Sequence, residues 1–168
     1  MNIAIRRLRR GDAEEFMRLW REGVTPEAFG SHFEEAKTRP RSFFIEFLAP
    51  SPRRIVWGAF RGSTMLGFIR LQREGRGVRR HIYSMYVTPA ERGRGLARRL
   101  LRLAIRQARR APQVRQVCLK VTATNVPARA LYRSIGFRDY GLDHDTFTAD
   151  GVWHSTYRMR KFVRSRAR

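Results

Sequence analysis

Hydrophobic and polar residues follow two different periods along this chain, and each period predicts a different kind of element. Residues 3–8 read Ile-Ala-Ile-Arg-Arg-Leu and predict a first strand. A helix is then expected from Asp12, a favourable capping residue, to Gly23. Its apolar face is marked at helical spacing by Phe16, Leu19 and Trp20.

Prolines shape the segment that follows. Residues 25–27 combine a capping threonine with a proline in the first turn, which predicts a second helix carrying Phe29 and Phe33 inward. Pro40 and the segment 50–52 favour a loop region before the next strands.

The rest of the chain contains the clearest strand patterns and the longest helix. Strands are predicted at residues 54–60, 65–72, 81–87, 114–122, 137–140 and 153–162. Residues 61–64 join the first two in a hairpin, and a polar loop separates the last two. Helices are predicted at 95–110 and 125–135. This order predicts an α/β fold of the α+β kind in a single domain, residues 1–168. Its mixed, mostly antiparallel sheet would have six to seven strands flanked by about four helices.

Composition narrows the class of protein. Cys118 is the only cysteine, which excludes an internal disulfide and a cysteine-rich zinc site, so no metal is expected. No segment approaches the roughly 20 apolar residues of a membrane span. Residues 1–10 also lack the apolar run of a signal peptide. A soluble cytoplasmic protein with no membrane partner is the expectation.

The formal net charge of +22 comes almost entirely from arginine. The positive electrostatic field of such a charge attracts phosphate groups, whether those of a cofactor or of nucleic acid. The helix at 95–110 would carry a basic stripe made of Arg98, Arg102, Arg106 and Arg109 or Arg110. Nonspecific association with nucleic acid and a merely solvated basic surface both stay open.

A glycine-rich segment between a strand and the longest helix gives the first chemical clue. It reads Arg92-Gly93-Arg94-Gly95-Leu96-Ala97. Backbone N–H groups at a helix start have no partner within the helix and lie at the positive end of its dipole. Glycines let the backbone approach an anion closely. The segment therefore predicts a phosphate-bearing ligand.

Two common phosphate loops do not fit this segment. A dinucleotide fingerprint needs glycine or alanine where Arg98 stands, and an acidic residue about twenty positions further on. Lys120 and Thr122 occupy that neighbourhood. A nucleoside-triphosphate loop needs Gly-Lys-Ser/Thr, which the chain lacks. Both nucleotide sites are disfavoured.

Two motifs together resemble one family. Residues 92–97 match the pattern Gln/Arg-x-x-Gly-x-Gly/Ala of the GNAT superfamily of N-acetyltransferases. Residues 125–137 read Asn-Val-Pro-Ala-Arg-Ala-Leu-Tyr-Arg-Ser-Ile-Gly-Phe and match its signature Asn-x-x-Ala-x-x-Leu-Tyr-x-x-x-Gly-Phe. Each motif follows a predicted strand, in the order that the family has.

The resemblance implies an acyltransferase that moves the acetyl group of acetyl-CoA to a primary amine by direct attack in a ternary complex. The amine could belong to a small molecule, a peptide or a protein. The pantetheine arm would meet the backbone of Met85, Tyr86 and Val87, and the pyrophosphate would rest on the N–H groups of residues 92–97. Further cofactor contacts are implied for Asn125, Ala128 and Tyr132.

The resemblance also gives Tyr132 a catalytic role, that of a general acid protonating the departing CoA thiolate. A phenol within hydrogen-bond reach of a leaving group can serve in this way. Tyr132 would equally fit a core pair with Leu131. Asn125 is also a good helix cap, and it can fill both roles.

The base that takes the proton of the amine is less clearly marked. In the branch that acetylates ribosomal protein N-termini, the base lies five residues before the motif asparagine. Lys120 stands there in this chain and cannot be a carboxylate base. Strand period places His81, Tyr83 and Met85 on one face, so His81 and Tyr83 are base candidates. His144, His154 and a water chain without a dedicated base are the alternatives.

The sequence gives only a weak indication of the acceptor amine. Four carboxylates near the last strands would favour a cationic amine, although aspartate is also a common turn residue: Asp139, Asp143, Asp145 and Asp150. The alternative function is a GNAT-fold basic module that associates with nucleic acid or ribosomes, with weak or no catalysis. The resemblance also allows a homodimer.

Overall fold

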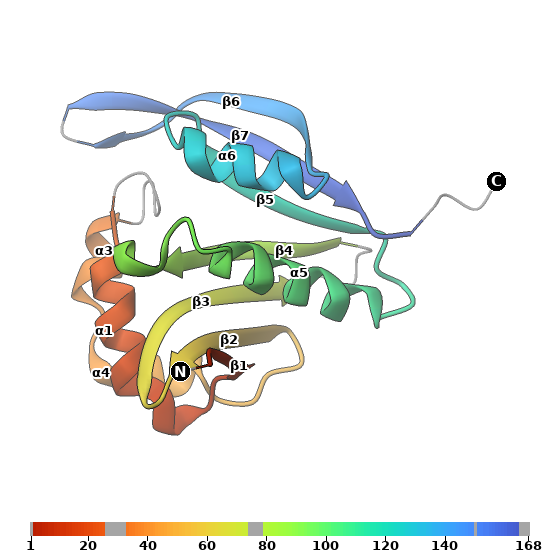
Figure 1. Cartoon of the computed structure of the whole chain (residues 1–168). Coiled ribbons are helices and arrows are strands. Elements are labelled where there is room, and N and C mark those ends of the chain that lie inside the picture. The colour runs from red at the N-terminus through yellow and green to blue at the C-terminus, as the bar shows by residue number, and fades with distance from the viewer. Residues whose placement is uncertain (1, 26–32, 74–78, 150, 165–168) are drawn as a thin grey trace.

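The computed structural model describes residues 2–25, 33–73, 79–149 and 151–164. Within them, one sheet has seven strands in the order β1-β2-β3-β4-β5-β7-β6. The strands are β1 (Ala4–Arg7), β2 (Arg54–Arg61), β3 (Thr64–Arg73), β4 (Arg79–Val87), β5 (Gln116–Thr122), β6 (Arg138–Ala149) and β7 (Val152–Phe162). Every neighbouring pair is antiparallel except β4 and β5. The expected mixed, mostly antiparallel sheet is confirmed (Figure 1).

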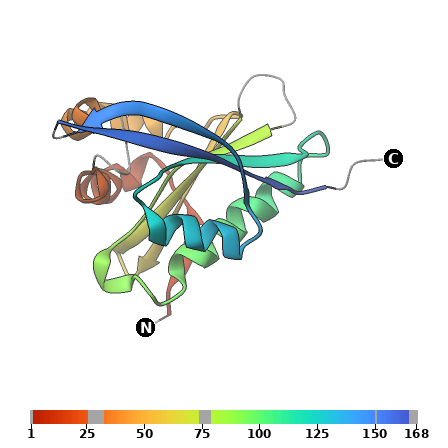
Figure 2. The same cartoon turned by 90° about the horizontal axis from the view of Figure 1, so that it is seen from above.

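Helices cover both faces of this sheet (Figure 2). The described residues form α1 (Ala13–Gly23), α3 (Phe33–Thr38), α4 (Arg41–Phe47), α5 (Leu96–Arg109) and α6 (Val126–Ser134), with short 3-10 turns η1 (Arg10–Asp12) and η3 (Pro89–Glu91). Helices α5 and α6 lie on one face, and the N-terminal helices lie on the other. Residues 26–32, which hold most of the expected second helix start and Phe29, lie outside the described residues.

Two hydrophobic cores hold the sheet between these layers. The first packs α5 and α6 on the sheet and includes the fully buried Leu100, Leu101 and Phe137. The second packs α1 and α4 on the opposite face, where the Phe16 ring meets the rings of Phe44 and Phe68 edge-on at 5.7 and 5.0 Å. Strands β3 and β4 contribute to both cores, so they are fixed from both faces.

The segment after Pro40 differs from the expected loop, because residues 41–47 form α4. Pro40 has extended backbone angles and takes the capping position, where its missing N–H costs nothing. Phe44 and Phe47 are buried against α1. Tertiary packing, which the local sequence does not reveal, stabilises this short helix.

The last hairpin is also longer than expected. The polar stretch after Tyr140, for which the sequence predicts a loop, continues as β6 to Ala149. Register shifts interrupt its pairing with β7 between Asp139 and Gly141, and again between Asp143 and Phe147. Because β6 is an edge strand with one neighbour, polar side chains and bulges are tolerated there.

Asp12 precedes α1 as expected, but its side chain does not cap the helix. The carboxylate instead accepts hydrogen bonds from the backbone N–H of Arg9 and from the Arg6 guanidinium, at 2.8 and 2.6 Å. These contacts hold the pKa of Asp12 below its ordinary value, with the Arg6 hydrogen bond as the largest cause. The N-terminal strand is thereby tied to the start of α1.

Candidate functional site

Strands β4 and β5 pair along their first residues and then diverge. Their parallel pairing runs from Arg79 with Gln116 to Ile82 with Leu119, and no further pair joins them. The last four residues of β4, Ser84 to Val87, therefore have a strand partner only on the β3 side. Their backbone groups on the β5 side form an open edge at which an extended ligand can pair. We call this V-shaped opening the fork (Figure 1).

A β-bulge lies at the base of the fork. The register of β4 with β3 jumps between Ser84 opposite Arg70 and Ile82 opposite Leu71, so Tyr83 is the extra residue. The bulge reverses the alternation of side chains. Ile82 and Met85 consequently pack on the same core. The expectation that His81, Tyr83 and Met85 share one face is therefore wrong for Met85.

The glycine loop follows β4 directly. Gly93 and Gly95 have φ angles of +74° and +80°, which other residues adopt at a cost. Gly95 occupies the capping position of α5. Among the described residues, the first backbone hydrogen bond of this helix runs from the Arg99 N–H to the Gly95 carbonyl. The N–H groups of Leu96, Ala97 and Arg98 precede this bond and have no partner within the helix.

The arginines of the loop have different surroundings. The Nε of Arg92 donates to the Val87 carbonyl at 3.1 Å, and its guanidinium lies 5.7 Å from the centre of the Tyr86 ring. Arg92 thus braces the turn between β4 and the loop. Arg94 is exposed and lies 3.9 Å from the carboxylate of Glu91.

Glu91 was not singled out from the sequence. Its side chain is buried beneath the loop and pairs with the Arg61 guanidinium at 2.8 Å. A buried carboxylate needs such a partner. The pair connects the β2–β3 hairpin with η3, immediately before the glycine loop. The sequence carried no signal for this contact, because thirty residues separate its partners.

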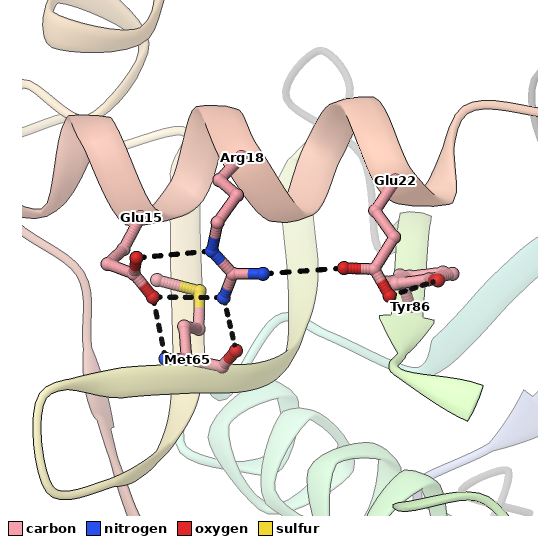
Figure 3. A network of polar contacts seen from close by, with 5 residues as sticks. All are labelled: Glu15, Arg18, Glu22, Met65 and Tyr86. Carbon is pink, nitrogen blue, oxygen red and sulfur yellow. Dashed lines mark hydrogen bonds and ion pairs between the residues drawn. The ribbon is translucent and has the colours of Figure 1, made fainter. Parts of the chain in front are cut away.

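A polar network joins α1 to β3 and β4 (Figure 3). The hydroxyl of Tyr86 donates to Glu22 at 3.0 Å, and Glu22 pairs with Arg18 at 3.4 Å. Arg18 also donates to the Met65 carbonyl at 2.9 Å and pairs with Glu15 at 3.0 Å. Burial is the main cause that raises the pKa of Tyr86, and the Glu22 contact adds to it. The network holds β4, one of the two strands of the fork, against α1.

The second motif surrounds the start of α6. Asn125 caps this helix, because its Oδ1 accepts from the Ala128 N–H at 3.2 Å. The Nη1 of Arg129 donates to the Ala123 carbonyl at 3.1 Å, and its guanidinium lies 3.9 Å from the centre of the Tyr157 ring. The turn after β5 is therefore rigidly held. The capping role of Asn125 is confirmed.

Tyr132 lies within the core that lines one side of the fork. Its side chain is buried in the cluster that also holds Val87, Leu96 and Val121. Its ring packs on Phe137 at 5.9 Å. Burial raises the pKa of Tyr132 to about 12. The phenol therefore keeps its proton at any physiological pH, as a proton donor must.

The two base candidates lie together. The rings of His81 and Tyr83 are 5.8 Å apart at the base of the fork, on the face opposite the α5 core. His81 is half-buried and Tyr83 is exposed. The other histidines lie on the last hairpin, where His144 is exposed and His154 stacks on Phe147 at 4.9 Å.

Lys120 points away from the core into an ion-pair cluster. Its Nζ is 3.8 Å from Asp143, whose other oxygen binds Arg158 at 2.8 Å. Asp139 likewise pairs with Arg133 at 2.5 Å. Two of the four carboxylates that suggested a cationic acceptor are thus neutralised by the protein itself.

The described residues contain no group of three or more His, Cys, Asp or Glu side chains placed to hold a metal ion. Cys118 is buried and takes part in no disulfide. In the same ranges, no helix combines the length and the apolar character that crossing a membrane requires.

Comparisons with known proteins agree with this geometry. Residues 13–137 match the model of the Acetyltransferase (GNAT) family, so the chain belongs to this family. N-alpha-acetyltransferase RimI of Mycobacterium tuberculosis is 36% identical over 124 residues, which span 73% of this chain and 74% of that protein.

Solved structures share the fold at lower identity. A GNAT-family acetyltransferase of Streptococcus pneumoniae superposes with a TM-score of 0.84 at 22% identity, covering 96% of this chain and 99% of that one. Arabidopsis thaliana NAA60 in complex with acetyl-CoA gives 0.78 at 22% identity, covering 96% and 98%.

Family membership confirms the enzymatic expectation. The chain is an acetyl-CoA-dependent N-acetyltransferase that acts on an amine. The alternative of a basic binding module without catalysis is not favoured.

Proposed function

We propose that this enzyme acetylates the N-terminal α-amine of a peptide or protein. The observation that carries this proposal is the similarity to an N-alpha-acetyltransferase over most of both chains. The fork supports it, since its base opens on the face that α5 and α6 leave uncovered. An extended N-terminus can approach the thioester from that face.

Acetyl-CoA fits the fork and the glycine loop. The open edge of β4 at Met85, Tyr86 and Val87 offers N–H and C=O groups to the amides of the pantetheine arm. The free N–H groups at the start of α5, with the positive-φ glycines Gly93 and Gly95, suit the pyrophosphate. When bound, the cofactor supplies a thioester whose carbonyl carbon an amine can attack.

Tyr132 is the proposed proton donor. As the new C–N bond forms and the C–S bond breaks, the sulfur takes up the electron pair and needs a proton. The Oη of Tyr132 can hold that proton, because burial keeps the phenol neutral. Its place in the buried cluster that also holds Val87 and Leu96 supports this role.

His81 is the proposed base, with Tyr83 as the second candidate. Imidazole is the side chain that accepts a proton near neutral pH. His81 lies at the last residues that β4 shares with β5, close to where the acceptor amine must arrive. Lys120 is excluded from this role by its charge and by its pairing with Asp143.

The remaining expectations are also proposals. A single sheet that spans both halves of the described chain supports one domain. A chain whose single cysteine forms no disulfide, and its need for acetyl-CoA, support a cytoplasmic location. Exposed Arg102, Arg106 and Arg109 on α5 support nonspecific contact with polyanions. We also propose a homodimer, which the resemblance to the family allows.

The test follows the release of CoA thiol with acetyl-CoA and synthetic peptides. Tyr132→Phe should lower kcat by about 100-fold or more, which is the usual range for a lost acid–base group. Tyr140→Phe is the matched control and should stay within about 2-fold, because Tyr140 lies on β6 outside the fork. Full activity in Tyr132→Phe would exclude the donor role. Calorimetry showing no binding of acetyl-CoA would exclude the proposed cofactor site.

His81 is tested by its own variant. His81→Gln should lower kcat and shift the acidic limb of the pH profile, whereas Tyr83→Phe should preserve that limb. An unchanged profile in His81→Gln would transfer the role to Tyr83 or to water.

A further inference from the structure

Arg70 is a partly buried cation whose location the sequence did not explain. It lies on β3 opposite Ser84, on the face of the sheet that carries Phe68 and the α1–α4 core. Its guanidinium carbon is 4.6 Å from the centre of the Tyr83 ring and 5.3 Å from that of Phe47. Its Nε is buried without a hydrogen-bond partner among the described residues.

The charges around Arg70 do not neutralise it. No ion pair joins it to a carboxylate in the described part of the chain, and its charged neighbour is Arg54, which stacks on the same Phe47 ring at 4.2 Å. Burial, followed by repulsion from Arg54, lowers the pKa of Arg70 to about 10. Aromatic rings compensate only part of the cost of burying a guanidinium. A bound anion would offset the remaining cost of burying this guanidinium.

Arg70 lies beside the place where the acceptor must bind. Tyr83, over which its guanidinium stacks, is the bulge residue directly after the last pair of β4 with β5. His81, the proposed base, is 5.8 Å from Tyr83 between ring centres. The guanidinium is thus one side chain away from the base of the fork.

The neighbouring strands add further positive charge to this face. His81 is in register with Cys118, and Cys118 with Arg160, so these three residues point the same way. Lys120 and Arg158 share that face two residues along. The carboxylate that pairs here, Asp143, is already bound to both. The acceptor side is therefore cationic.

We propose that Arg70 binds a carboxylate of the acceptor, carried close to the amine that is acetylated. This inference rests on the proposed function. It names an N-terminus whose second residue is acidic as the preferred acceptor, because a glutamate side chain can pair with Arg70 while the amine reaches the fork. The α-carboxylate of a free amino acid offers the same chemistry, and the experiment separates the two sources.

The experiment compares three peptides that begin Ala-Glu, Ala-Gln and Ala-Lys and are otherwise identical, together with free glutamate and alanine. Wild type should use the Ala-Glu peptide with a kcat/KM about tenfold above that of the Ala-Gln peptide, mostly through KM, as expected for one charge-assisted pair. Arg70→Gln should abolish this preference, and Arg70→Lys should keep part of it. Arg54→Gln is the matched control, since it removes a cation from the same Phe47 ring while leaving Arg70 in place, and it should retain the preference.

A second readout does not depend on turnover. With CoA present, calorimetry should show tighter binding of the N-acetylated Glu peptide than of its Gln counterpart, and this difference should vanish in Arg70→Gln. Thermal unfolding verifies that the variants are folded. If Arg70→Gln does not fold, Arg70→Lys tests the carboxylate site instead. If the site exists, Arg70→Lys should prefer the Glu peptide over the Gln peptide less strongly than wild type does.

The outcomes are distinct. Equal use of all three peptides by wild type, or a preference that survives in Arg70→Gln, would overturn the Arg70 site and leave the proposed function standing. Selective use of free glutamate, lost in Arg70→Gln, would support the site and assign the carboxylate to an amino acid. No turnover of any acceptor would overturn the proposed function, and the calorimetry would then decide on Arg70 by itself.

Discussion

The Tyr86 hydroxyl donates a 3.0 Å hydrogen bond to Oε1 of Glu22, so the end of α1 is tied to β4 beside the open edge of the fork (Figure 3). The contact continues into Gly23, where an added Cβ would come within 2.6 Å of the Tyr86 ring carbons. The absence of a side chain at Gly23 thus allows α1 to approach the strand that we propose binds the cofactor.

Gly23→Ala should therefore destabilise the protein by about 1–3 kcal/mol, because the new methyl group must displace the Tyr86 ring. Chemical denaturation measures the change. Gly11→Ala is the control, since nothing lies within 4 Å of an added Cβ there. The double variant Gly23→Ala, Tyr86→Leu should be destabilised by less than the sum of the two single variants. Strict additivity would contradict the contact.

Glu91→Gln should cost about 1–3 kcal/mol of stability, because it leaves Arg61 without its charged partner over a buried site. The KM for acetyl-CoA should rise as well, since η3 leads directly into the glycine loop. Urea denaturation and initial rates measure the two effects. Glu46→Gln is the control at an exposed ion pair and should change stability by less than about 0.5 kcal/mol. An unchanged KM would show that Glu91 does not support cofactor binding by the glycine loop.

Asn125 can be tested for its two roles separately. Asn125→Ala removes the cap of α6 and should cost about 1 kcal/mol, whereas Asn125→Ser restores a capping oxygen and most of the stability. If Asn125 also contacts the cofactor arm, both variants should raise the KM for acetyl-CoA. A KM that recovers together with stability in Asn125→Ser would assign Asn125 to capping alone.

Tyr132 makes a prediction about pH. Its pKa is raised from 10.0 to about 12, so the folded protein keeps this proton where an unfolded tyrosine loses it. Its contribution to stability is therefore complete below pH 10 and is lost as the pH rises toward about 12. Across that window, the unfolding free energy of wild type should fall relative to that of Tyr132→Phe by about 1.4 kcal/mol for each unit of pKa shift. A difference between the two proteins that stays constant with pH would show that Tyr132 is not buried in this way.

The sequence by itself determined the features that depend on neighbouring residues. The long helix from Gly95, the hairpin at 61–64 and the cap at Asn125 all follow from local periodicity and backbone chemistry. The two motifs also gave the glycine loop and Tyr132 as site candidates, because they are contiguous stretches whose chemistry can be recognised without a structure.

The tertiary structure decided what depends on pairing between distant segments. The bulge at Tyr83 arises from the register of β4 with β3, and it moved Met85 away from the face of His81. The edge position of β6 turned an expected polar loop into a strand. The burial of Glu91 against Arg61, and of Arg70 between two rings, joins residues that are far apart in the sequence. Such contacts have no local pattern, because they depend on which surfaces the folded sheet brings together.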